Sequence, residues 1–205
     1  MSAEQTGLRS DWNVQVRRFY DKNAADYCRS TVGLDMSAQR ALFAGQLPSG
    51  ARVLDLGCGS GRDLKSFLGQ GFAAIGIDLS PRMAEWAASY VGASVAVGDT
   101  RAIPFSNLSF DGVWCSAALH HLPRTELGQA LGEIHRILKR DGATFISIKR
   151  GIGQGRDPDG RPFTYVTDRE WRRLLTQAGF RIIKQSGPGD DPVWISTLAR
   201  KTASS

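Results

Sequence analysis

The pattern of apolar positions predicts a long helix near the beginning of the chain. Between residues 12 and 27, large and mostly apolar side chains recur every three or four positions, which places them on one helical face. They are Trp12, Val16, Phe19, Tyr20, Asn23 and Tyr27. A second helical pattern covers residues 34–47 and ends at a Pro-Ser-Gly sequence. Residues 11–47 are therefore expected to form helices that cap the remainder of the fold.

Beyond residue 51 the pattern changes to short apolar runs that alternate with helical stretches. These runs are predicted as seven strands, at residues 52–56, 72–77, 94–97, 110–116, 144–149, 180–185 and 193–200. Strands that alternate with helices form crossovers and a mainly parallel sheet with helices on both faces. Only residues 186–192 separate the last two runs, which is too short for a parallel crossover. We predict an α/β fold: a three-layer αβα Rossmann-like sandwich with a seven-stranded, mostly parallel sheet and an antiparallel last strand.

Three helix boundaries follow from local signals. Ser80 before Pro81 is typical of a helix start, with the serine as N-cap and the proline in the first turn. Residues 167–170 read Thr-Asp-Arg-Glu, which predicts a capped start for another helix. The apolar stripe between residues 127 and 138 is expected to continue as a helix until Asp-Gly at residues 141–142.

Length and composition indicate one domain. The chain has 205 residues, 41% of them hydrophobic, and no apolar run reaches the ~20 residues that cross a bilayer. We expect a single domain over residues 11–201, with flexible tails at residues 1–10 and 202–205. The first residues lack the apolar core of a secretory signal, and the three cysteines are not spaced as a metal site or a disulfide framework. A cytoplasmic protein without membrane contact or a metal site is therefore predicted.

The segment from Asp55 to Gly61 links the first predicted strand to a helix through three glycines. Its G-x-G-x-G spacing differs from the G-x-G-x-x-G of dinucleotide sites, and no Gly-Lys-Ser/Thr phosphate loop follows. Asp78 and Asp99 end the next two strands, and the carboxyl ends of parallel strands meet at one edge of a sheet. At that edge Asp78 could accept hydrogen bonds from ribose hydroxyls, and Asp99 could reach an adenine amino group. The sequence therefore predicts a nucleoside site.

Together these segments resemble the class I S-adenosylmethionine-dependent methyltransferases. The resemblance covers residues 52–149 closely, and it rests on D-x-G-x-G-x-G at residues 55–61, on residues 76–81, on Asp99-Thr100 and on residues 110–116. It implies S-adenosylmethionine as the methyl donor and S-adenosylhomocysteine as the product. The residues that it places at the donor are Tyr20, Asp55, Gly57, Cys58, Gly59, Asp78, Leu79, Met83, Asp99, Thr100 and Ser116. For Tyr20 a place on the apolar face of the first helix is an equal alternative.

Two histidines follow the fourth predicted strand, at the edge where the resemblance places methyl transfer. His120 and His121 are candidate general bases, because a neutral imidazole accepts a proton near pH 7. The favoured alternative is a structural role in which the pair shapes the pocket.

Residues 150–166, called the insert below, follow the fifth predicted strand and are rich in glycine and basic residues. The insert leaves the sheet on the ligand side, where it would be either a lid over the acceptor or an ordinary surface loop. Lys149, Arg161 and Tyr165 are predicted to bind the acceptor, since the two basic side chains suit a carboxylate or a phosphate.

Three functions remain open at this point. The first is methyl transfer to a small acceptor, and the net charge of +6 permits that acceptor to be an anion. The second is tRNA modification, because residues 117–149 are similar to enzymes that methylate a carboxymethyl group on wobble uridine, although no aromatic and basic stripe for base stacking accompanies them. The third is a non-catalytic protein that binds S-adenosylmethionine. The methylated atom and the oligomeric state do not follow from the sequence.

Overall fold

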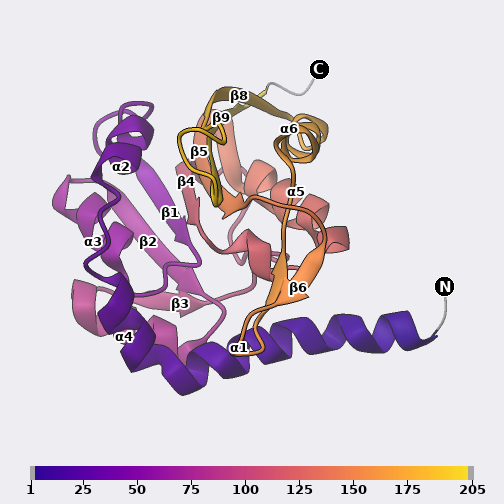
Figure 1. Ribbon diagram of the computed structural model, residues 1–205. Helices are drawn as coiled ribbons and strands as arrows, with labels where there is room; N and C mark the ends of the chain where they lie inside the picture. Colours follow the sequence, from indigo (N-terminus) through magenta and orange to yellow (C-terminus); the bar gives the residue numbers. More distant parts are fainter. Residues whose placement is uncertain (1–2, 203–205) are drawn as a thin grey trace.

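The computed structural model describes residues 3–202, with side chains from residue 12 onward. At its centre lies a seven-stranded sheet in the order β3-β2-β1-β4-β5-β9-β8 (Figure 1). The strands are β1 (Arg52–Leu56), β2 (Ala73–Asp78), β3 (Val95–Val97), β4 (Phe110–Ser116), β5 (Leu138–Lys149), β8 (Phe180–Gln185) and β9 (Trp194–Lys201). Neighbours from β3 to β5 are parallel, and β9 is antiparallel to both β5 and β8. The predicted sheet, including its antiparallel last strand, is confirmed.

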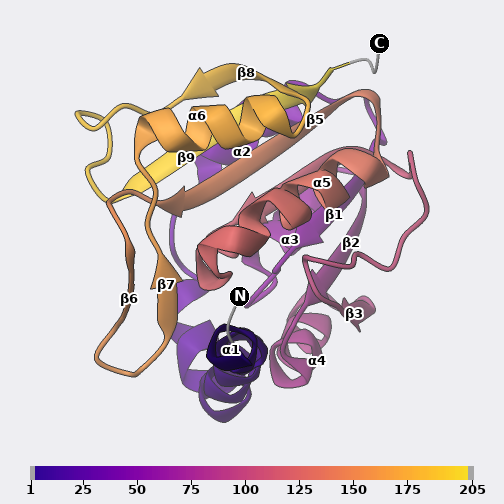
Figure 2. The same cartoon turned by 90° about the vertical axis from the view of Figure 1, so that its right-hand side faces the viewer.

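Helices cover both faces of this sheet. They are α1 (Ala3–Thr31), α2 (Ser37–Ala44), α3 (Arg62–Gly69), α4 (Pro81–Val91), α5 (Leu127–Ile137) and α6 (Asp168–Gln177), with 3-10 turns η1 (Leu119–His121) and η2 (Arg124–Glu126). Figure 2 shows α5 and α6 on the face turned toward the viewer, with α2 and α3 behind the sheet. The three-layer αβα sandwich is therefore confirmed. None of the helices in the described part of the chain combines the length and the apolar character needed to cross a membrane.

Each face of the sheet has its own apolar core. On one face the buried rings of Phe43 from α2 and Phe67 from α3 pack against Trp114 of β4. Trp114 also stacks on Phe145 of β5, with 4.1 Å between ring centroids. On the other face α5 and α6 bury an apolar stripe that includes Leu131 and Trp171. Apolar burial on both faces explains why the central strands read as nearly continuous apolar runs.

The helix α1 runs along the lower edge of Figure 1, where it contacts α4 and the insert. The insert forms a hairpin of two short antiparallel strands, β6 (Gln154–Arg156) and β7 (Pro162–Thr164). Arg156 of this hairpin donates a hydrogen bond to Gln15 of α1. Two segments that are far apart in the sequence therefore lie side by side across the edge where the parallel strands end.

The structure adds detail at both chain ends. Residues 3–10, which were expected to belong to a tail, form the first part of α1, while Met1 and Ser2 lie outside the described residues. At the other end, Thr202 is held by hydrogen bonds from its backbone N–H and its hydroxyl to the Gly179 carbonyl, at 2.9 and 2.8 Å. The rest of the second predicted tail, residues 203–205, lies outside the described residues.

The predicted helix end at residues 141–142 is wrong. The helix α5 stops at Ile137, and β5 begins directly at Leu138, which is fully buried and pairs with Phe110 of β4. Pairing with β4 therefore outweighs the local signal, and Asp141 with its positive φ of 63° lies inside a strand with an irregular register. The two predicted helix starts are confirmed, since Ser80 and Thr167 accept hydrogen bonds from the N–H groups of Met83 and Glu170.

Candidate active site

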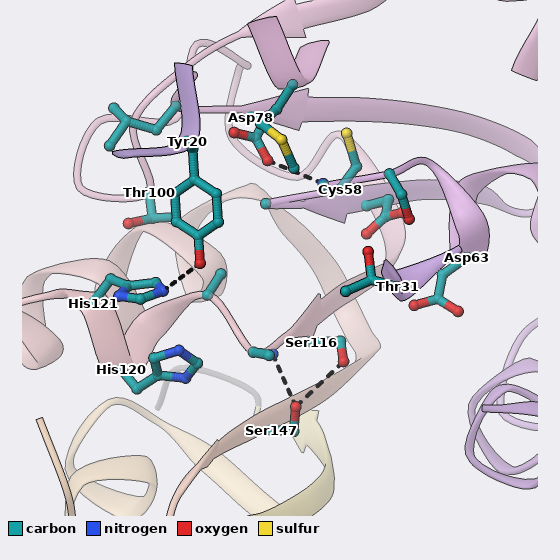
Figure 3. A pocket seen from close by; sticks show the side chains of 18 of the residues that line it. Tyr20, Thr31, Cys58, Asp63, Asp78, Thr100, Ser116, His120, His121 and Ser147 are labelled. Atoms are coloured by element: carbon teal, nitrogen blue, oxygen red, sulfur yellow. Dashed lines mark hydrogen bonds between the residues drawn. The ribbon is translucent and has the colours of Figure 1, made fainter. Parts of the chain in front are cut away.

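A cavity of about 470 Å³ lies at the carboxyl ends of the parallel strands, under α1 and the insert. It is centred on β1, where the strand order reverses, with β2 on one side and β4 on the other. Doubly wound sheets bind their ligands at such a switch point. The volume falls in the range of roughly 300–1,000 Å³ that is common for small-molecule sites. Figure 3 shows this cavity from close by.

The glycine loop that follows β1 forms one wall of the cavity. Gly57, Gly59 and Gly61 all have positive φ angles, of 74°, 56° and 78°, which side chains rarely allow. A Cβ atom at Gly57 would lie only 2.6 Å from the Cβ of Ala118, in the turn after β4. The loop is anchored to β2, because the N–H groups of Gly57 and Cys58 both donate to the Ile77 carbonyl. The backbone itself is therefore the surface that a ligand meets here.

Asp78, at the end of β2, faces the glycine loop. Its Oδ2 accepts a hydrogen bond from the Gly59 N–H at 3.0 Å, as Figure 3 shows, and its Oδ1 accepts one from the Ser80 N–H at 2.9 Å. Burial raises the pKa of this carboxyl to about 6, although the backbone N–H groups partly offset the effect. Each carboxylate oxygen has two acceptor positions, so Asp78 can still accept from a ligand's hydroxyl groups.

Asp99, in the turn after β3, is already engaged by two donors. The Arg101 guanidinium approaches it to 2.6 Å, and the Asn13 side-chain amide of α1 donates to its Oδ2 at 2.8 Å. Burial acts to raise the pKa of Asp99, but the hydrogen bonds from Arg101 outweigh it and hold the pKa below its usual value. An adenine amino group would therefore share Asp99 with the Asn13 amide or replace that amide.

His121, in η1, makes a hydrogen bond through each of its two ring nitrogens. His121 contacts the Pro162 carbonyl through Nδ1 at 3.1 Å and the Tyr20 hydroxyl through Nε2 at 2.8 Å (Figure 3). Because a carbonyl only accepts, Nδ1 carries the proton, and the Tyr20 hydroxyl donates to Nε2. His121 therefore links Tyr20 of α1 to Pro162 of the insert. While the hydrogen bond from Tyr20 is present, His121 has no free nitrogen to accept a proton from a substrate.

Both histidines are buried, which keeps them neutral. Burial lowers the pKa of His121 to about 4. Burial also lowers the pKa of His120 well below its usual value, and the neighbouring His121 lowers it further. A charged imidazole is therefore disfavoured at this end of the cavity near pH 7.

The structure brings nearly all of the predicted site residues to the cavity wall. They are Tyr20, Asp55, Gly57, Cys58, Gly59, Asp78, Leu79, Met83, Asp99, Thr100, Ser116, His120, His121, Lys149 and Arg161. Tyr165 is the exception: its ring lies over Gly151 within the insert, and Phe163 lines the cavity instead. The insert is part of the site through Phe163 and Arg161, although its motion as a lid remains a prediction.

The comparisons with known proteins agree with this geometry. A family model described as a methyltransferase domain matches residues 53–142, which include the glycine loop, Asp78 and Asp99. An uncharacterized methyltransferase of a Geobacillus species is 28% identical over 200 residues, which cover 91% of each chain. A crystal structure of Burkholderia thailandensis 1,6-didemethyltoxoflavin-N1-methyltransferase, with bound 1,6-didemethyltoxoflavin and S-adenosylhomocysteine, has a TM-score of 0.77 and 26% identity over 95% of this chain and 91% of that one. These similarities support a class I S-adenosylmethionine-dependent methyltransferase.

Some relatives of this chain are considerably longer. An uncharacterized protein of Methanocaldococcus jannaschii is 33% identical over 135 residues, and these cover 65% of this chain but only 51% of that protein. The matched part of the chain therefore spans about half the length of that relative.

Asp55 tests whether the cavity can hold S-adenosylmethionine. Its side chain is 2% exposed, and its Oδ2 has no hydrogen-bond partner in the described part of the chain. Burial raises the pKa of Asp55 well above its usual value, and the charge of neighbouring Asp63 adds to this. A buried carboxyl oxygen without a partner is costly unless a ligand supplies a donor. The α-ammonium group of S-adenosylmethionine would supply one, so the cavity fits this molecule.

The cavity is also lined by residues that were not predicted as part of the site, among them Asn13, Arg62, Phe163 and Trp194. Asn13, Val16 and Tyr20 share one face of α1, so the face that we interpreted as apolar is partly the cavity wall. Because Asn13, Val16 and Tyr20 are three and four residues apart, their spacing could have indicated that they share this face. Arg62 follows the glycine loop directly and pairs with Asp63 at 2.6 Å, and its guanidinium would suit the α-carboxylate of the donor.

We expect the affinity for S-adenosylmethionine to fall as the pH is lowered through about 6. Ribose hydroxyls donate to an ionised carboxylate, and burial raises the pKa of Asp78 to about 6, so protonation removes the form that binds. Below that pH the Kd should rise about tenfold per pH unit, and above it the Kd should level off. Calorimetry with S-adenosylhomocysteine across this range measures the effect. A Kd that stays constant across the range would contradict the role of Asp78.

Proposed function

We propose that the protein transfers the methyl group of S-adenosylmethionine to a small anionic acceptor. The observation that carries this proposal is the separation of charge in the cavity. Near the glycine loop the lining acids outnumber the cation Arg62; they are Asp55, Asp63, Asp78 and Asp99. At the opposite end, beside the insert, Lys149 and Arg161 line the cavity together with one acid, Asp191. Arg161 pairs with Asp157 at 2.6 Å, but no carboxylate lies within 4.0 Å of the Lys149 ammonium among the described residues. The opposite end thus attracts an anion.

The chemistry at this end requires alignment more than acid–base catalysis. S-adenosylmethionine supplies a methyl group on a positively charged sulfur, which is already electrophilic. Holding the nucleophile in line with that methyl group can lower the activation barrier by up to roughly 7–11 kcal/mol. An anionic acceptor has its reactive lone pair free, so it needs no general base. This agrees with the burial of His120 and His121, which lowers the pKa of both and makes each a weak base.

A small acceptor is supported by the contact between the insert and α1 beside the cavity. Arg161 of the insert lies over the Phe19 ring of α1, with its guanidinium carbon 4.5 Å from the ring centroid. The Burkholderia methyltransferase, whose structure matches nearly the whole of this chain, holds a small molecule, 1,6-didemethyltoxoflavin. In this chain the insert and α1 bound the end of the cavity beside Arg161, which supports an acceptor of that size class.

The release of S-adenosylhomocysteine from a panel of small acids tests the proposal. We expect turnover with at least one acid and at least tenfold less with its neutral amide or methyl ester, because the neutral compound cannot pair with Lys149. The readout is S-adenosylhomocysteine quantified over time. Equal turnover of charged and neutral compounds would contradict an anionic acceptor.

The same assay decides between this proposal and the two alternatives from the sequence. Methylation of tRNA with a steep salt dependence, and of no small acid, would support an enzyme of the wobble-uridine type. Binding of S-adenosylmethionine without transfer to acids, tRNA or cell extract would support a non-catalytic binding protein. Residence in the cytoplasm stays a prediction.

A further inference from the structure

Three aromatic rings lie together at the basic end of the cavity, beside Lys149. The His120 ring stacks on Phe163 of β7, with 5.0 Å between centroids and 25° between planes. The Trp194 ring, at the beginning of β9, lies 5.3 Å from His120. All three residues line the cavity, and they come from η1, the insert and the last strand. We call this group the ring cluster. Flat apolar faces of this kind bind flat ligands by stacking and edge contacts.

The Lys149 ammonium lies beside the ring cluster. Its Nζ is 4.9 Å from the Phe163 ring centroid and 5.2 Å from the Trp194 ring centroid. Asp191 also lines the cavity, but its Oδ1 accepts hydrogen bonds from the N–H groups of Val193 and Trp194, and it is not within 4.0 Å of Lys149. The rings of Phe163 and Trp194 stabilise the positive charge of Lys149. A negatively charged group of a ligand could therefore pair with this ammonium.

His120 adds a second polar group without a protein partner. The residue is 3% exposed, and its Nδ1 makes no hydrogen bond within the described part of the chain. A buried ring nitrogen that lacks a partner costs about 1–3 kcal/mol. Since this ring lines the cavity beside Lys149, a polar atom of the acceptor is the natural partner.

We propose that the acceptor is a flat aromatic molecule with an acidic hydroxyl or ring N–H group, bound as its anion against the ring cluster and Lys149. This inference rests on the proposed function and names the chemical class of its acceptor. The aromatic body contacts Phe163 and Trp194, and the anionic atom faces the ammonium.

The reaction balances with such an acceptor. The acidic proton passes to water when the acceptor binds as an anion. The bond between sulfur and the methyl carbon breaks, and its electron pair stays on sulfur as a thioether. The lone pair of the oxygen or nitrogen anion forms the new bond to that carbon. A cation and an anion thereby give two neutral products, and no oxidant or metal takes part.

The ionisation of a bound probe tests the inference without any methyl transfer. The probe is 4-nitrophenol, whose phenolate absorbs visible light, bound to the full chain in the presence of S-adenosylhomocysteine. We expect the bound probe to ionise about one to three pH units lower than the free probe, because an ammonium lies close to its oxygen. Lys149→Met should abolish the shift. Lys65→Met is the matched control, since that ammonium also lies over a ring, 4.0 Å from the centroid of Tyr90, outside the cavity.

The aromatic part of the inference has its own comparison. Trp194→Leu should weaken the binding of 4-nitrophenol about tenfold, whereas Tyr90→Leu, outside the cavity, should leave it unchanged. Hexanoate, an aliphatic acid, should displace the probe at least tenfold less effectively than benzoate does. Circular dichroism and the affinity for S-adenosylhomocysteine establish that each variant is folded.

The outcomes separate this inference from the proposed function. The inference is overturned if 4-nitrophenol does not bind saturably, if its ionisation is unshifted, or if hexanoate competes as well as benzoate. Turnover of aliphatic acids alone would keep the proposed function and overturn only the aromatic acceptor. A shifted probe together with no turnover of any small acid would contradict the proposed function and leave the binding site in place.

Discussion

Alanine in place of Gly57 is expected to abolish measurable binding of S-adenosylmethionine. The new Cβ would lie 2.6 Å from the Cβ of Ala118, which is closer than two carbon atoms approach without a backbone shift. The φ of 74° adds about 1–2 kcal/mol of strain for a residue with a side chain. A backbone shift that relieves this contact would move the glycine loop either into the cavity or away from Asp78. We expect a loss of affinity of at least about a hundredfold, measured by calorimetry.

Gly92→Ala is the matched control for this variant. Gly92 has a φ of 72°, close to that of Gly57, but nothing lies within 4 Å of a Cβ added there. The control therefore carries the same strain without the contact. It should lower the melting temperature by a few degrees and leave the affinity for S-adenosylmethionine unchanged. If both variants lose affinity equally, strain alone accounts for the loss, and the close approach of the loop to Ala118 is irrelevant.

Asp78→Ala should weaken the binding of S-adenosylmethionine by more than tenfold. A hydrogen bond to a charged group contributes about 1.5–3 kcal/mol, and 1.4 kcal/mol corresponds to a factor of ten in Kd. The variant should still fold, because burial raises the pKa of this carboxyl to about 6, which means that its charge opposes folding near pH 7. Calorimetry gives the affinity, and a thermal melt establishes the fold.

Asp26→Ala controls for the loss of a negative charge. The Asp26 side chain is 85% exposed, and among the described residues Arg29 is its ion-pair partner. Its removal should change the affinity for S-adenosylmethionine by less than a factor of two, because exposed ion pairs contribute about 0–1 kcal/mol or less. Unchanged affinity in Asp78→Ala would overturn the assignment of Asp78 to the donor.

The glycine loop and Asp78 could be predicted from the sequence because both depend on local rules. Glycines at positions 57, 59 and 61 make a loop with positive φ possible, and the apolar run before them predicts a buried strand. Parallel strands joined by crossovers must end at the same edge, so Asp78 and Asp99 had to lie near that loop. Neither step requires knowledge of how distant segments pack.

The acceptor end could not be predicted in the same way. Tyr20 and His121 are 101 positions apart, and their hydrogen bond depends on how α1 crosses the ends of the strands. Phe163, rather than Tyr165, lines the cavity because of the way in which the hairpin of the insert packs on η1. No periodicity in such a short hairpin indicates which side faces a ligand.

Packing also outweighed a local helix-end signal, the Asp-Gly pair at residues 141–142. The Asp-Gly pair at residues 141–142 is typical of a helix end, yet β5 already begins at Leu138. Leu138 is fully buried and pairs with Phe110, so its contacts with the core decide the conformation.

By itself, the sequence determined the sheet, the switch point and the donor end of the site, because strand spacing, glycine positions and strand-end acids act over a few residues. Only the tertiary structure decided the acceptor end. Lys149, His120 and Trp194 come from three separate segments, and their common surroundings exist only once those segments are packed. Among the described residues, no carboxylate pairs with the Lys149 ammonium and no group bonds the buried Nδ1 of His120. Both observations support the proposed acceptor, and both depend on how the whole fold packs.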